Sequence, residues 1–219
     1  MLERTDRAGL QSRPASLSEG LRERTRDLHV RAERSGIFAD MLKGRITREG
    51  YAWLLRGLLP IYQTLERQLA RHAASSPVAL IARPELYRAP AIAADLGYFP
   101  PGGEDRSAAV LRYVDAINSA SEGDGSRLIA HAYVRYLGDL SGGQILSRLL
   151  SRSLDLPPAA LSFYVFPAIA DIGAFKSDFR AALDRAGDRI EDFDAVVEEG
   201  ALAFEMNIGL SIALQEGVA

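Results

Sequence analysis

The chain lacks cysteine altogether. Disulfide bonds, thiolate nucleophiles, iron–sulfur clusters and cysteine-type zinc sites are therefore excluded, and so is any haem held by a thiolate. Long apolar runs are missing as well. No stretch reaches the roughly 18 apolar residues of a transmembrane helix, and residues 1–16 lack the apolar segment of a signal peptide. We expect a soluble, cytoplasmic protein that does not enter the membrane.

An excess of charge of either sign is also lacking. The 26 basic and 29 acidic residues leave a formal net charge of −3, so no strong field attracts nucleic acid or an anionic membrane. The chain does have an ordinary globular composition, with 47% apolar and 25% charged residues among 219. Such a chain can bury one full core. We expect a monomer with one folded domain over residues 16–219, preceded by a disordered tail over residues 1–15.

Apolar residues recur at helical spacing, and no segment shows sustained alternation with β-branched residues. The pattern predicts an all-α fold of about seven or eight helices. Prolines divide the segment 77–104 into short pieces. The expected helices cover residues 16–36, 38–43, 47–69, 105–119, 127–154, 172–186 and 190–215.

Polar residues mark where several of these helices begin. Ser16 stands three residues before Glu19, the spacing of a capping box, and Thr47 is a suitable N-cap for the third helix. Either Asp124 or Ser126 can cap the long helix from residue 127. Pro60 lies inside the third helix and is expected to kink it.

Three glycines lie within the long helix, at Gly138, Gly142 and Gly143. Each costs about 0.5–1 kcal/mol relative to alanine in a helix interior. Two explanations stay open. A flat ligand can lie directly on the bare backbone, with the glycine pair allowing a kink, or another helix can pack closely across Gly138 and Gly142. Asp139 stands between them, and Arg135 four residues earlier can pair with it.

The chain has only three histidines. His29 lies on the less polar stripe of the first helix, and Glu33 one turn later can orient its imidazole. Arg22 and Arg26, one to two turns earlier, can bind acidic groups of a ligand. Haem needs such a set, an imidazole for iron and cations for two propionates. For the other two histidines, His72 and His131, we expect structural roles.

Residues 25–33 and 128–144 together resemble the heme oxygenase family. Residues 43–50 and 204–207 also fit, in the right order, and the resemblance runs from about residue 16 to the C-terminus. It implies haem b bound between a proximal helix and a kinked distal helix. It also implies oxidative cleavage to biliverdin, carbon monoxide and ferrous iron with O2, at the α-meso carbon.

The resemblance also implies a role for each matching residue. His29 would ligate the iron, and Glu33 would form a hydrogen bond with the His29 imidazole. Asp139 would organise the water that donates a proton to the distal oxygen. The other matches form three groups. Distal glycines are Gly138, Gly142 and Gly143; the distal polar network is Tyr62, Arg135 and Asn207; the propionate-facing residues are Arg22, Arg26, Tyr133, Lys176 and Arg180.

Two features depart from the family pattern. Pro60 precedes Tyr62 by two residues, and the proximal cations Arg22 and Arg26 replace the more frequent lysines. Both bear on which ring carbon is attacked. The chain carries no flavin, NAD(P) or iron–sulfur motif, so electrons must come from a ferredoxin or an NAD(P)H-dependent reductase.

Three rival interpretations explain the sequence less well. A haem carrier would keep His29 and the cations but would not need Asp139. A thiamin-pyrimidine hydrolase on a similar helical fold would need a cysteine nucleophile, which is missing. A purely structural helical protein explains neither the cost of the glycines nor the repeated motif matches.

Overall fold

The computed structural model describes residues 14–217. Over these residues the chain forms eight α-helices, four single-turn 3-10 helices and no strand, so the all-α prediction is confirmed. The predicted disordered tail falls outside the described residues as far as residue 13. The α-helices are α1 (Leu17–Glu33), α2 (Gly36–Leu42), α3 (Arg48–Arg71), α4 (Ala89–Leu96), α5 (Ala108–Ala120), α6 (Leu128–Ser153), α7 (Ile172–Gly187) and α8 (Phe193–Glu216).

Helix starts follow the predicted caps in two of three cases. The Ser16 side chain accepts from the Glu19 amide, and that of Thr47 accepts from the Gly50 amide. The prediction for α6 is wrong: its N-cap is Arg127, with no side-chain hydrogen bond. Asp124 instead accepts from the Ser126 amide at 3.0 Å, inside the preceding loop. The short side chain is used by a local turn and is not available to the helix.

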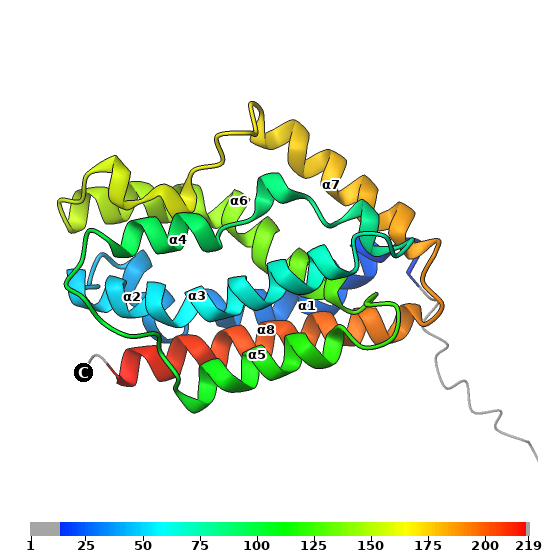
Figure 1. Ribbon diagram of the computed structural model, residues 1–219, viewed down its shortest axis with the longest axis horizontal. Helices are drawn as coiled ribbons and strands as arrows, with labels where there is room; N and C mark the ends of the chain where they lie inside the picture. Colours follow the sequence, from blue (N-terminus) through cyan, green and yellow to red (C-terminus); the bar gives the residue numbers. More distant parts are fainter. Residues whose placement is uncertain (1–13, 218–219) are drawn as a thin grey trace, which may run out of the picture.

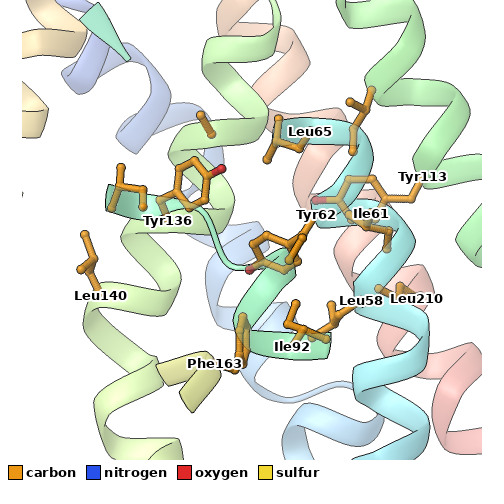
Figure 2. Packing of buried hydrophobic residues seen from close by; sticks show 14 of the residues in the cluster. Leu58, Ile61, Tyr62, Leu65, Ile92, Tyr113, Tyr136, Leu140, Phe163 and Leu210 are labelled. Atoms are coloured by element: carbon orange, nitrogen blue, oxygen red, sulfur yellow. The ribbon is translucent and has the colours of Figure 1, made fainter. Parts of the chain in front are cut away.

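α8 is the central support of the fold, because it packs against α1, α2, α5 and α6. Figure 1 shows α8, α5 and α3 lying alongside one another, with α7 standing to one side of the bundle. Three fully buried tyrosines, Tyr62, Tyr113 and Tyr136, come from α3, α5 and α6 (Figure 2). α3 continues through Pro60 to Arg71 and still buries Tyr62 completely.

The start of α2 is fitted tightly against α8. Gly36 has φ +55°, and a Cβ at this residue would lie 2.2 Å from the Ser211 carbonyl oxygen. The Ser211 hydroxyl donates to the Ser35 carbonyl at 2.9 Å and accepts from the Phe38 amide at 3.2 Å. Glycine is needed here for both conformation and space, and the contact fixes the position of Phe38.

α4 is anchored by a carboxylate from α3. Glu66 accepts hydrogen bonds from the backbone amides of Arg88 and Ala89, at the first turn of α4. Its side chain is buried, and burial raises the pKa of Glu66 from 4.5 to about 7 against the opposing effect of these hydrogen bonds. The carboxyl group that anchors α4 is therefore buried and titrates near neutral pH.

A stability measurement tests this titration. Since folding raises the pKa of Glu66, ionising it costs more in the folded state. Its contribution to the free energy of unfolding should therefore fall as pH rises from 4.5 towards 7, by at most about 1.4 kcal/mol per pH unit. Glu66→Gln keeps an acceptor oxygen and should flatten this part of the profile in urea denaturation. Exposed Glu122→Gln is the control, and parallel profiles for both variants and the wild type would contradict the assignment.

No helix among residues 14–217 combines the length and the apolar character needed to cross a membrane.

Candidate active site

One cavity of about 770 Å³ is lined by residues of α1, α2, α3, α6, α7 and α8 and of the 3-10 turn Ser162–Tyr164. Most of the predicted site residues line it, together with an apolar wall to which the sequence analysis gave no role. Helical periodicity gives no signal that these apolar side chains face a cavity. They include Phe38, Leu42, Leu58, Val134, Leu137, Ile145, Leu146, Phe163 and Phe204.

α1 brings His29 to this cavity. The helix buries Leu21, Thr25, Leu28 and Ala32 on one face, which leaves His29 at the edge of the packed stripe with its side chain 59% exposed. The ring lies 5.9 Å from that of Phe204, tilted by 58°. The Glu33 carboxylate lies 3.7 Å from His29 Nδ1, within ion-pair range and longer than a hydrogen bond.

α6 contributes a stretch of bare backbone. A Cβ built at Gly138 or Gly142 would meet no atom within 4 Å, and both glycines line the cavity. Helix packing therefore does not account for these two residues. Gly143 differs, because its Cβ would lie 3.0 Å from Cδ1 of Tyr164. Gly138 and Gly142 thus leave room for a ligand, while Gly143 also lines the cavity but leaves room for the Tyr164 side chain.

Asp139 stands on the same wall, held by a buried network. The Tyr62 hydroxyl donates to Asp139 Oδ2 at 2.5 Å. Arg135 donates from Nε and Nη2 to the same hydroxyl, at 3.0 and 2.9 Å, and from Nη1 to Asn207 Oδ1 at 2.5 Å. The sequence suggested a direct ion pair between Arg135 and Asp139, but the two side chains are linked through hydrogen bonds to the Tyr62 hydroxyl. Tyr62 itself does not line the cavity.

Burial sets the protonation of this network. Asp139 is only 8% exposed, and burial raises the pKa of its carboxyl, although the Arg135 charge and the Tyr62 hydrogen bond partly oppose the shift. Burial also raises the pKa of Tyr62 well above its usual value, so this hydroxyl stays a donor. Asp139 is a carboxyl group at the cavity whose affinity for a proton is increased.

Basic side chains also line the cavity. Arg22 comes from α1, and Lys176 and Arg180 come from α7. Tyr133 of α6 lines the same cavity, and the Lys176 Nζ donates to the Ser141 hydroxyl at 3.3 Å. Arg26 does not line the cavity. Its side chain is 81% exposed and lies 3.7 Å from Asp27, so a role in binding needs a ligand group that extends beyond the cavity.

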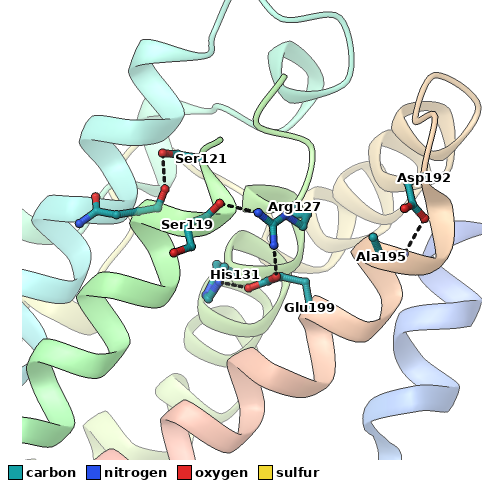
Figure 3. Close-up of polar contacts among 8 residues, drawn as sticks. Ser119, Ser121, Arg127, His131, Asp192, Ala195 and Glu199 are labelled. Carbon is teal, nitrogen blue, oxygen red and sulfur yellow. Dashed lines mark hydrogen bonds and ion pairs between the residues drawn. The ribbon is translucent and has the colours of Figure 1, made fainter. Parts of the chain in front are cut away.

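The other two histidines lie outside the cavity lining. His131 is fully buried, and its Nε2 lies 2.9 Å from Glu199, which also contacts Arg127 at 3.4 Å (Figure 3). His72 is the C-cap of α3. These placements agree with structural roles for both.

Comparison with known proteins identifies the family. The family model described as heme oxygenase matches residues 15–212. This chain belongs to the heme oxygenase family. Human heme oxygenase 1 is 36% identical over 212 residues, which cover 94% of this chain and 74% of the human protein. The heme oxygenase of Takifugu rubripes is 37% identical over 206 residues, 91% of this chain and 74% of that protein.

Solved heme oxygenases share the fold. The enzyme from Leptospira interrogans is 37% identical with a TM-score of 0.84, covering 90% of this chain and 99% of that one. Heme oxygenase-1 from Synechocystis sp. PCC6803, solved in complex with heme, is 32% identical with a TM-score of 0.85, covering 93% of this chain and 94% of that one. The described helices of this chain therefore form a heme oxygenase fold.

Proposed function

We propose that this heme oxygenase binds one haem in the cavity between α1 and α6 and opens its ring to biliverdin, carbon monoxide and ferrous iron. One observation carries the proposal: His29 and the bare backbone at Gly138 and Gly142 line the same cavity. An imidazole can bind iron, and a helix without side chains lets a flat ring approach closely. The Synechocystis relative solved in complex with heme supports this choice of substrate.

The cations orient the substrate in this proposal. Arg22, Lys176 and Arg180 bind the two propionates, with Tyr133 beside them, and Glu33 orients the His29 imidazole from one turn away. Guanidinium and ammonium groups form strong, charge-assisted hydrogen bonds to carboxylates. Fixing the propionates fixes which meso carbon faces Asp139. We propose the α-meso carbon.

Asp139 organises the proton donor in this proposal. Its carboxyl holds a water in the cavity, and that water donates a proton to the distal oxygen. Tyr62, Arg135 and Asn207 keep the carboxyl in place through their hydrogen bonds. O2 is the co-substrate, and the haem itself supplies the iron that activates it.

The electron donor is proposed to be an external ferredoxin or an NAD(P)H-dependent reductase, acting on a monomer. The basic residues at the cavity suit an acidic donor surface. Reversing an exposed charge outside the cavity lining, as in Arg26→Glu, should slow reduction by the protein donor more than reduction by a small chemical reductant. Equal effects on both rates would contradict this docking surface.

Hemin uptake and turnover test the function directly. One equivalent of hemin should give a sharp Soret band, and a reductant in air should convert that band into the broad red absorption of biliverdin. The extracted pigment then identifies the meso carbon. A Soret band that persists when electrons are supplied would indicate a haem carrier, and no Soret shift at all would refute the proposal.

A conservative change at Gly142 separates stability from function. Gly142→Ala adds a methyl group that meets no protein atom within 4 Å, so we expect the hemin-free protein to gain about 0.5–1 kcal/mol from improved helix propensity. The same methyl group enters the ligand space, so hemin affinity should fall. Thermal melts and hemin titrations measure the two effects. Gly143→Ala is the contrast, because it meets Tyr164 and should not gain stability.

A further inference from the structure

The two ends of α7 are held in different ways. At its C-terminal end, the Asp184 carboxylate accepts from the Ser18 amide at 2.9 Å, and a Cβ at Gly187 would lie 2.8 Å from Leu17 Cβ. This end is tightly packed against the start of α1. In the first half of the helix most residues are exposed or half-buried, with Phe179 the buried exception. Lys176 lies in this half of α7, and Arg180 follows directly after Phe179.

Arg83 holds this less packed half. Its Nη1 lies 2.7 Å from Asp178 Oδ2. Its guanidinium carbon lies 5.3 Å from the Phe175 ring centroid and 5.8 Å from that of Phe179. These two rings stack at 6.4 Å with an interplanar angle of 15°. Arg83 thus contacts residues i, i+3 and i+4 of α7, which form one helical face.

The position of Arg83 in the chain makes it a fixed support. It is the N-cap of the 3-10 turn Pro84–Leu86 and follows the turn Val78–Leu80. Its Nε donates to the Leu80 carbonyl at 3.3 Å, and its side chain is 19% exposed. Arginine suits this place because a planar guanidinium can pair with a carboxylate and lie against aromatic rings together.

The face that Arg83 holds is next to the face that meets the cavity. Lys176 follows Phe175 by one residue, and Arg180 follows Phe179 by one, a rotation of about 100° around the helix. Turning α7 about its own axis would move both cations together relative to the cavity. The contacts of Arg83 oppose this rotation from the neighbouring face of the helix.

We infer that Arg83 is a positioning residue: by holding Phe175, Asp178 and Phe179, it sets the direction from which Lys176 and Arg180 meet the substrate's propionates. It thereby helps decide which meso carbon is attacked. This inference rests on the proposed function. Arg83 itself does not line the cavity, so its influence passes through α7.

Arg83→Ala, Arg83→Lys and Asp178→Asn test the inference, with exposed Arg112→Ala on α5 as the control. Hydrogen exchange in the hemin-free protein should accelerate over residues 172–180 in Arg83→Ala, with α8 unchanged. The share of minor biliverdin isomers should rise by about fivefold or more once the aromatic and ionic contacts are lost. Arg83→Lys keeps the charge but loses the stacking, so it should fall between the wild type and Arg83→Ala.

The isomer ratio distinguishes positioning from a general loss of stability, which lowers yield without changing the ratio. An Arg83→Ala variant with the wild-type ratio and wild-type exchange over residues 172–180 would overturn the inference while the proposed function stands. A wild-type protein that takes up no hemin would refute the proposed function, and the positioning role with it.

Discussion

Asp139→Ala is expected to bind hemin with near wild-type affinity and to open the ring about 10²–10⁴-fold more slowly, the usual contribution of a positioned proton donor. The substitution removes the carboxyl that accepts from Tyr62 at 2.5 Å and borders the cavity. His29 and the cations that would bind hemin are untouched. Single-turnover decay of the Soret band measures the rate, and pigment extraction measures the biliverdin yield.

The exposed Asp115→Ala on α5 is the matched control, since it removes the same group far from the cavity. Tyr62→Phe is a graded companion that keeps the carboxyl but cuts its link to Arg135. Its rate should lie between those of the wild type and Asp139→Ala. A normal biliverdin yield from Asp139→Ala would contradict the role of Asp139 in organising the proton-donating water.

His29→Ala is expected to lose the spectrum of a haem held by a neutral imidazole, and turnover with it. The His29 side chain is 59% exposed beside the cavity, so its removal leaves an opening that a small molecule can enter. Added imidazole should therefore restore the Soret band and part of the activity. Absorption spectra and resonance Raman spectra of the hemin complex report the axial ligand.

His72→Ala provides the control for this experiment, because His72 ends α3 and does not line the cavity. Its hemin spectrum should match that of the wild type. If His29→Ala kept an imidazole-type spectrum, the iron would be bound by His72 or His131. That result would contradict the placement of both residues outside the cavity.

Features of the fold that depend on near neighbours in the chain were predictable from sequence. The caps at Ser16 and Thr47 use amides three residues away, so spacing alone identifies them. The helical class follows from periodicity. The cap of α6 was not predictable, because Asp124 has a competing amide two residues away at Ser126, and local sequence does not decide between the two acceptor geometries.

Contacts between helices could not be predicted from residue spacing or periodicity. Spacing on α6 suggested that Arg135 pairs with Asp139, yet Tyr62 of α3 occupies the position between them. Only the packing of α3 on α6 brings that hydroxyl there. The same limit applies to Arg83, which lies 95 residues from Asp178 in the chain. The glycines gave a clear sequence signal, but their division into two roles depends on what surrounds each Cβ.

The location of His29 on α1 and of the bare backbone on α6 has a thermodynamic consequence. α1 packs against α8, α7 and α2, so a ligand touching both walls joins two helices that otherwise share little direct packing. Occupancy by hemin, as proposed, would raise the free energy of unfolding by an amount that grows with the logarithm of the ratio of free hemin concentration to Kd, and the melting temperature would rise with it. If His29 ligates the iron as proposed, ring opening and loss of iron would break that bond. Each catalytic cycle would thus return the protein to its less stable, emptied form and favour departure of the product.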